Sequence, residues 1–143
     1  MKTELITVLK QSQKQDLLKL YHQAWWSKDR TEDHVDFILA NSSLYVGIVD
    51  SQTNRLLGFL RVLTDYFKFA YIYDVIVDEN HQNLGLGKQL IQSVMDHPSL
   101  QTIPYIELVC KKTKQSYYEQ FGFTDNYGDS TSMRFVRPGV KSL

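Results

Sequence analysis

Cysteine is almost absent from this chain of 143 residues, because Cys110 is the only one. A single cysteine cannot form an intramolecular disulfide, and this scarcity fits a reducing compartment. No apolar run approaches the roughly 20 residues that a membrane-spanning helix needs, and residues 1–7 lack the apolar stretch of a secretory signal. We therefore expect a cytoplasmic protein that does not enter a membrane.

The chain also lacks an excess of charge of either sign, since 16 Lys and Arg balance 16 Asp and Glu. Without a basic surplus there is no overall field to hold a polyanion, so nucleic-acid binding is not expected. Prolines are few, and none forms a linker in the first two thirds of the chain. The length and a hydrophobic content of 43% predict one folded domain over residues 1–137, followed by a tail at 138–143.

Hydrophobic periodicity predicts an α/β fold with a mixed sheet. Strands are expected at 5–9, 44–49, 56–63, 69–77, 105–110, 123–127 and 132–136. Helices are expected to begin at a Ser12/Gln15 capping box and after a Thr31 N-cap, and to span 85–96 and 114–121. Short connections make the second, third and fourth strands an antiparallel meander.

The segment at 74–90 is the most informative about function, because a strand there leads through a polar loop into a helix that begins near two glycines. A helix start presents unpaired N–H groups and a positive dipole end, and glycine lets a ligand approach the backbone closely. This combination favours a pyrophosphate. The P-loop pattern fails because Gln89 follows Gly87-Lys88, and the dinucleotide fingerprint fails because Leu90 replaces its third glycine.

The remaining pattern, Gln82-x-x-Gly85-x-Gly87, resembles the coenzyme A pyrophosphate loop of the GNAT acetyltransferase superfamily. Downstream, the stretch from Tyr117 to Phe123 is similar to that family's aromatic-Tyr-x-x-x-Gly-Phe ending. The resemblance covers nearly the whole chain and is to small stand-alone bacterial members. It implies the GNAT fold, a mixed, mostly antiparallel sheet of about six or seven strands flanked by about four helices.

The resemblance also implies acetyl-CoA as co-substrate and roles for particular residues. Tyr118 would be the acid that protonates the departing thiolate. The strand backbone would pair with the pantetheine arm at Val75, Ile76 and Val77. The pyrophosphate would be surrounded by the backbone of Gln82, Asn83, Leu84, Gly85, Leu86, Gly87 and Lys88.

Acceptor-side candidates come from two carboxylates and two tryptophans. Asp74 interrupts an apolar strand, where a lone buried carboxylate is costly. It either orients or deprotonates the amine, or it pairs with a base such as Arg61. Asp65 is a second pocket candidate whose alternative is a turn residue, and Trp25 and Trp26 lie where members of this family often border the acceptor site.

We predict an acetyl-CoA-dependent N-acetyltransferase that moves the acetyl group directly to a primary amine of a small molecule or peptide. The alternatives are a catalytically silent coenzyme A-binding module and a binder of a different phosphate ligand. No metal is expected, because the four histidines are scattered and no His-Glu-x-x-His or Cys-x-x-Cys motif occurs.

Many family members carry an asparagine after the fifth strand, where this chain has lysines at 111, 112 and 114. A homodimer is common in the family, and no residue here decides it.

Overall fold

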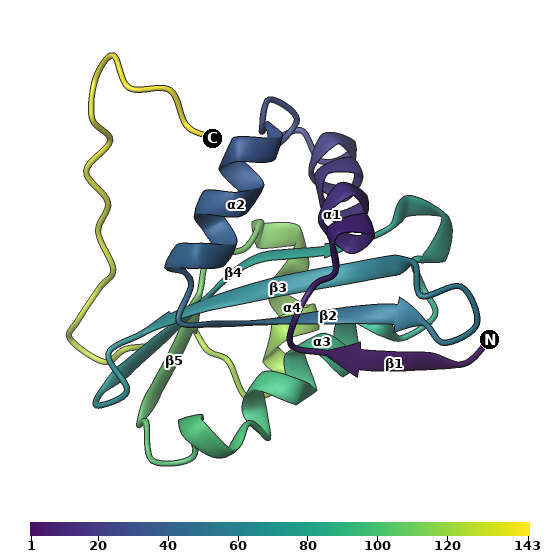
Figure 1. The fold of residues 1–143 in the computed structure, drawn as a ribbon. Helices are drawn as coiled ribbons and strands as arrows, with labels where there is room; N and C mark the ends of the chain where they lie inside the picture. Colours follow the sequence, from purple (N-terminus) through teal and green to yellow (C-terminus); the bar gives the residue numbers. More distant parts are fainter.

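The computed structural model describes all 143 residues, which build one sheet with helices on both of its faces (Figure 1). The sheet order is β1-β2-β3-β4-β5, antiparallel from β1 to β4 and parallel between β4 and β5. The strands are β1 (Thr3–Ile6), β2 (Leu44–Asp50), β3 (Leu56–Thr64), β4 (Phe69–Val77) and β5 (Tyr105–Leu108). The helices are α1 (Gln11–Gln23), α2 (Glu32–Asn41), α3 (Leu86–Met95) and α4 (Gln115–Glu119), and none is long and apolar enough to cross a membrane.

The predicted mixed α/β architecture and the β2–β4 meander are confirmed, and the structure moves two early boundaries. The first strand is Thr3–Ile6, because these residues pair with Gly47–Asp50 of β2. The predicted Ser12/Gln15 capping box is wrong. Gln13 performs that task, since its side-chain oxygen accepts from the backbone N–H of Lys10 at 2.8 Å and its amide donates to the carbonyl of Asn54 at 3.0 Å.

The N-cap predicted for α2 is confirmed. Thr31 has an extended backbone, and its hydroxyl accepts from the backbone N–H of His34. Glu32 and Asp33 occupy the first turn, where negative charge is favourable beside the positive end of the helix dipole. This cap fixes the end of the α1–α2 connection, which contains Arg30.

Each face of the sheet carries its own apolar core. One core lies between the sheet and α3, and includes Leu60, Leu90 and Ile91. The other lies between the sheet and α1 and α2, and includes Leu17, Tyr21 and Phe59. β4 contributes to both cores, so residues that interrupt its apolar pattern are held between two packed layers.

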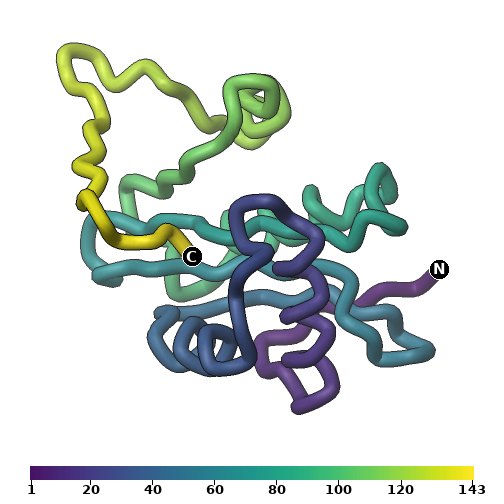
Figure 2. Tube along the Cα trace, turned by 90° about the horizontal axis from the view of Figure 1, so that it is seen from above, coloured from purple at the N-terminus to yellow at the C-terminus, as the bar shows by residue number.

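The C-terminal part differs from the sequence-based expectation. The predicted strands at 123–127 and 132–136 do not form, so the sheet has five strands rather than six or seven. After Gly122, whose φ of 96° confirms the expected left-handed cap of α4, the chain contains one isolated antiparallel bridge between Tyr127 and Ser130. Figures 1 and 2 show this segment running outside the body of the molecule before the C-terminal end returns toward the top of α2. Residues 123–136 pair with no strand of the sheet in this structure.

Close packing of α3 on the sheet depends on Gly58 in β3. A Cβ at this position would lie 2.9 Å from Ile48 Cγ2, 3.1 Å from Leu90 Cδ1 and 3.2 Å from the carbonyl oxygen of Ile76. We predict that Gly58→Ala lowers the free energy of unfolding by about 1–3 kcal/mol, the usual cost of overpacking a core. Urea denaturation measures this change. Ser130→Thr, which adds a methyl group at an exposed residue, is the control, and equal stability of Gly58→Ala and wild type would contradict the packing argument.

Candidate functional site

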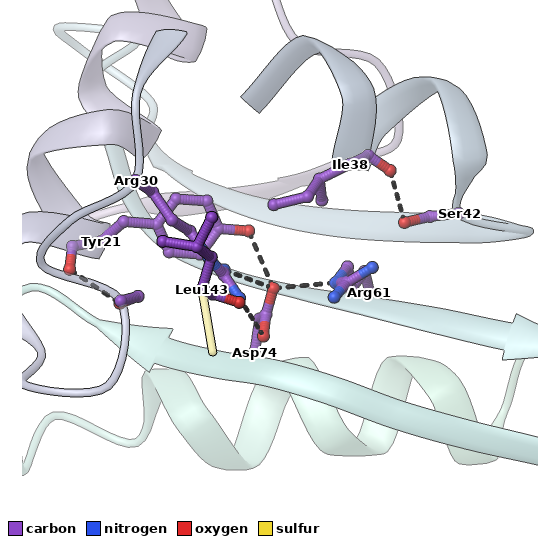
Figure 3. A network of polar contacts seen from close by, with 8 residues as sticks. Tyr21, Arg30, Ile38, Ser42, Arg61, Asp74 and Leu143 are labelled. Atoms are coloured by element: carbon purple, nitrogen blue, oxygen red, sulfur yellow. Dashed lines mark hydrogen bonds and ion pairs between the residues drawn. The ribbon is translucent and has the colours of Figure 1, made fainter. Parts of the chain in front are cut away.

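A bulge in β4 sets the centre of the candidate site. Phe59 pairs with Ile76 and Arg61 pairs with Tyr73, so Leu60 of β3 stands opposite two residues of β4. One of these is Asp74, which has a φ of 57° in the left-handed region that non-glycine residues rarely adopt. Bulges re-aim side chains and occur next to active sites. Here the bulge directs the Asp74 carboxylate toward α1 and the α1–α2 connection (Figure 3).

The Asp74 carboxylate is almost fully buried, with 7% of its side chain exposed, and is held by three side chains (Figure 3). Its Oδ2 accepts from Arg30 Nη1 at 2.8 Å, Arg61 Nε at 2.8 Å and Tyr21 Oη at 3.0 Å. A second Arg30 nitrogen lies 3.4 Å from Oδ1 and also donates to the backbone oxygen of Leu143 at 3.1 Å. The Arg61 ion pair, one of the two interpretations of Asp74, is therefore present, and Arg30 is a second counter-charge that sequence reasoning missed.

Aromatic rings hold the buried guanidinium of Arg30 in place. Its Cζ lies 4.3 Å from the centroid of the Tyr21 ring and 5.4 Å from that of Trp26. Burial, and next the neighbouring Asp74 carboxylate, raises the pKa of Tyr21 far above its ordinary value, so the phenol stays a hydrogen-bond donor.

The loop between β4 and α3 presents an open backbone. Asn83 and Gly85 have φ values of 64° and 81°, both left-handed, and α3 begins at Leu86. No heavy atom beyond the chain neighbours lies within 4 Å of where a Cβ at Gly85 would stand. The start of α3 leaves unpaired N–H groups and a positive dipole end beside the open position at Gly85, which suits an anion.

A second buried carboxylate, Asp78, fastens the base of this loop to the rest of the fold. Gln23 donates to it at 2.7 Å, His81 Nδ1 lies 2.5 Å away, and Arg55 lies 3.6 Å away. Gln23 also accepts from the backbone N–H of Glu79 at 3.0 Å, so α1 holds both residues at the start of the loop. Burial opposes ionisation of Asp78, but the hydrogen bonds from Gln23 and His81 and the charge of Arg55 outweigh it and lower the pKa.

Sequence reasoning missed the role of Asp78. The signal was available, because Asp78 ends the same apolar strand in which Asp74 had drawn attention as a costly buried acid.

The two adjacent tyrosines of α4 point in different directions. Tyr118 packs against the core below α3 and meets the ring of Phe123 edge-on at 6.2 Å. Burial, and less strongly Tyr117 and Cys110, raises the pKa of Tyr118 to about 12. The hydroxyl of Tyr117 instead lies beside Gly87, 2.9 Å from where a Cβ would stand there. Tyr117 thus borders the loop, whereas the sequence had favoured a core position for it.

The predicted acceptor-side residues are not gathered at one place. Trp26 meets the ring of Tyr21 edge-on at 6.4 Å, next to the Asp74 network. Trp25 is 70% exposed and lies 5.6 Å from the ammonium of Lys111. Asp65 lies in the β3–β4 turn, where its Oδ1 accepts from the backbone N–H groups of Phe67, Lys68 and Phe69 at 2.9–3.1 Å. These hydrogen bonds lower the pKa of Asp65. Its carboxylate therefore stabilises the turn, which was the alternative interpretation of this residue.

An open groove of about 480 Å³ lies along the same turn. It is lined by Ser43, Leu63, Thr64, Asp65, Phe69 and Tyr71. No group of three or more His, Cys, Asp or Glu residues in the structure is placed to hold a metal ion.

Comparison with known proteins gives a consistent result. The family model described as "Acetyltransferase (GNAT) family" matches residues 12–123. The chain is 30% identical over 110 residues to the uncharacterized N-acetyltransferase ycf52 of Pyropia yezoensis, which covers 76% of this chain. It is 25% identical over 103 residues to the chloroplastic GCN5-related N-acetyltransferase 1 of Arabidopsis thaliana, which covers 72% of this chain. The matched region spans only 63% and 52% of the length of these two relatives.

Among solved structures, a protein of Xanthomonas campestris pv. campestris that is ascribed to the GNAT family superposes with a TM-score of 0.82. It is 28% identical in sequence, and the match covers 100% of this chain and 99% of that one.

Asp78 yields a stability prediction with a defined pH dependence. Its folded pKa lies below the ordinary value of about 3.9, so the ionised carboxylate stabilises the fold above about pH 4. That contribution disappears as pH falls through the folded pKa. We predict that Asp78→Asn costs about 1–3 kcal/mol of unfolding free energy at neutral pH and that its difference from wild type narrows toward about pH 3.

Urea denaturation at several pH values tests this, with the exposed Asp96→Asn as the matched control. A difference that stays constant or grows on acidification would show that Asp78 is not the stabilising anion.

Proposed function

This chain belongs to the GNAT acetyltransferase family, and on that premise we propose that it transfers an acetyl group from acetyl-CoA directly to a primary amine of a small molecule or peptide. The observation that carries the proposal is the open backbone at the start of α3, where Gly85 is left-handed and unobstructed. A pyrophosphate is the ligand class such a helix start accepts most readily. A cytoplasmic location belongs to the same proposal and rests on the low cysteine content.

The residues present fit coenzyme A. The backbone of residues 82–88 would hold the pyrophosphate, and residues 75–77, at the end of β4, would pair with the pantetheine arm. β5 supports this arrangement, because it pairs with β4 only over Phe69–Ile72 and leaves residues 73–77 without a neighbour on that side. The bound thioester supplies an activated carbonyl carbon and a thiolate leaving group.

We propose that the Tyr118 hydroxyl stabilises the leaving thiolate as a hydrogen-bond donor. A thiol has an ordinary pKa of about 8.5, so a phenol with a pKa of about 12 is a weaker acid that stays fully protonated across the neutral range. It can therefore donate a hydrogen bond to developing thiolate charge at every pH at which the protein works. Tyr118 lies close to Cys110, just beyond β5, on the side where β4 and β5 separate.

Asp74 is better suited to positioning than to taking a proton. Its Oδ2 already accepts three hydrogen bonds from two arginines and a tyrosine, so no free lone pair of that oxygen faces an incoming amine. We propose that it fixes Arg30 and Arg61 along the acceptor side. An amine has an ordinary pKa of about 10.4 and is mostly protonated at neutral pH, so its proton would be released to solvent before attack.

The alternative is a coenzyme A-binding module without catalytic activity. It would use the same loop to bind the coenzyme as the proposed enzyme does. It keeps acetyl-CoA binding and predicts no thiol release with any amine. The single observation that favours this alternative is that Tyr118 packs against the core.

Binding is predicted to depend on the loop backbone. Isothermal titration calorimetry of the wild type should give tight acetyl-CoA binding, with ADP weaker. Gly87→Glu should abolish acetyl-CoA binding, because the new side chain puts negative charge at the pyrophosphate position and meets the Tyr117 hydroxyl. Gln92→Glu, which adds the same charge at an exposed residue of α3 away from the loop, is the control and should keep binding. Failure of folded wild-type protein to bind acetyl-CoA would overturn the proposed function.

Substitutions of the two adjacent tyrosines of α4 are predicted to have different effects on kcat. Tyr118→Phe should lower kcat by about 100-fold or more, the typical contribution of a general acid, with little change in acetyl-CoA affinity. Tyr117→Phe is the matched control, and it should keep kcat because its hydroxyl lies beside Gly87. Thiol release during an amine screen measures both variants. A large loss in Tyr117→Phe together with full activity in Tyr118→Phe would reverse the assignment.

A further inference from the structure

The tail, residues 138–143, lies on the α1–α2 connection and is held there by two polar contacts. The backbone oxygen of Leu143 accepts from Arg30 Nη2 at 3.1 Å (Figure 3), and Lys141 Nζ lies 3.2 Å from the Asp29 carboxylate. No backbone–backbone hydrogen bond involves the tail. Both side chains of the ion pair are more than half exposed, and such a pair contributes little to stability. The tail is therefore an occupant that another molecule can displace.

Arg30 is a fixed donor to which the tail brings an oxygen atom. Its Nη1 donates to Asp74 Oδ2 at 2.8 Å, whereas its Nη2 lies 3.4 Å from Oδ1 and makes its shorter hydrogen bond to Leu143. The rings of Tyr21 and Trp26 hold the guanidinium, with centroids at 4.3 Å and 5.4 Å from Cζ. A donor that is already immobilised loses little freedom when it binds. A guanidinium has donors only, so its ligand must supply an accepting oxygen, as a carbonyl or carboxylate does.

Asp29 places a negative charge next to this donor. Its carboxylate is 51% exposed, and its one ion-pair partner is the Lys141 ammonium. An anion and a guanidinium on adjacent residues together suit a ligand that carries both an ammonium group and a carbonyl oxygen. The tail presents this pair of groups, because its lysine ammonium lies at Asp29 and a backbone oxygen two residues later lies at Arg30.

We propose that Asp29 and Arg30 form a subsite for a peptide acceptor and that the tail occupies this subsite in the free protein. Asp29 takes an ammonium group of the peptide, and Arg30 takes a backbone carbonyl oxygen. The subsite adjoins the proposed reacting centre, because Arg30 is bonded to Asp74, which directly precedes the residues 75–77 assigned to the pantetheine arm. That this peptide is the acceptor rests on the proposed acetyl transfer, whereas its binding to the subsite does not.

The experiment compares three matched ligands by isothermal titration calorimetry of the whole chain without acetyl-CoA. The first is a capped peptide with the sequence of residues 140–143. The second is the same peptide with norleucine in place of lysine, which lacks the ammonium group, and the third is pentylamine, which lacks the carbonyl oxygens. The second and third should each bind at least about 10-fold more weakly than the first, because each loses a contact to a charged group.

Variants of the tail contact then test the competition. Lys141→Glu should lower the peptide Kd by about 2- to 5-fold, which is the contribution of an exposed ion pair, because it loosens the competing tail. Lys19→Glu, the same charge reversal at an exposed residue of α1, is the control and should leave the Kd unchanged. Asp29→Asn should make the peptide and its norleucine analogue bind equally, because the partner of the ammonium is gone.

A variant of the guanidinium tests the carbonyl contact. Arg30→Lys keeps a positive charge beside Asp74 but has no second donor group in a fixed fork, so it should raise the peptide Kd about 10-fold. Arg30 is buried, and urea denaturation shows whether this variant is folded. The Asp29 and Lys141 variants change exposed side chains and decide the proposal even if Arg30→Lys does not fold.

Equal binding of all three ligands to the wild type, or a peptide Kd that Lys141→Glu leaves unchanged, would overturn the proposal. Acetyl-CoA is titrated separately into the same protein. Acetyl-CoA binding without a preference for the peptide would refute the subsite and leave the proposed function standing. A preference for the peptide without acetyl-CoA binding would support the subsite and refute the proposed function.

Discussion

The buried carboxylate of Asp74 is the group on which the packing of α1 and the α1–α2 connection against β4 depends. It lies at a bulge of the central strand, and its partners come from α1, the α1–α2 connection and β3. A buried ion pair is tolerated only when its hydrogen bonds are complete, and removing one partner typically costs about 3–5 kcal/mol. Here every buried polar side-chain atom has a partner. The network therefore fixes three separate parts of the chain around one oxygen atom. Asp74 lies just beyond the residues of β4 that pair with β5.

Asp78 performs a similar task four residues further along the chain, directly after β4. It ties the start of the glycine-containing loop to α1 through Gln23 and to the β2–β3 connection through Arg55. The loop itself carries left-handed residues and an open backbone, neither of which a flexible segment would hold in place. These two buried carboxylates, one in β4 and one directly after it, thus hold the Arg30 network and the start of the glycine-containing loop in place relative to each other. This rigidity is what an acyl transfer between two bound molecules requires.

The strands of the sheet differ in how fully they are packed and paired. β4 is packed on both faces and paired on both sides at its start, whereas β5 pairs with β4 alone, and Met133, Phe135 and Val136 after α4 are exposed.

Local patterns in the sequence determined much of this protein. The meander, the Thr31 cap, the span of α3 and the two glycines at its start follow from neighbouring residues, and so does the family resemblance that the matched region at 12–123 bears out. Only the tertiary structure decided the rest. Arg30 lies 44 residues from Asp74 and Gln23 lies 55 residues from Asp78, and no periodicity encodes such pairs. The segment 132–136 has the alternation of a strand, yet it is not one in this chain. A helix closes its hydrogen bonds within itself, whereas a strand requires an edge supplied from elsewhere.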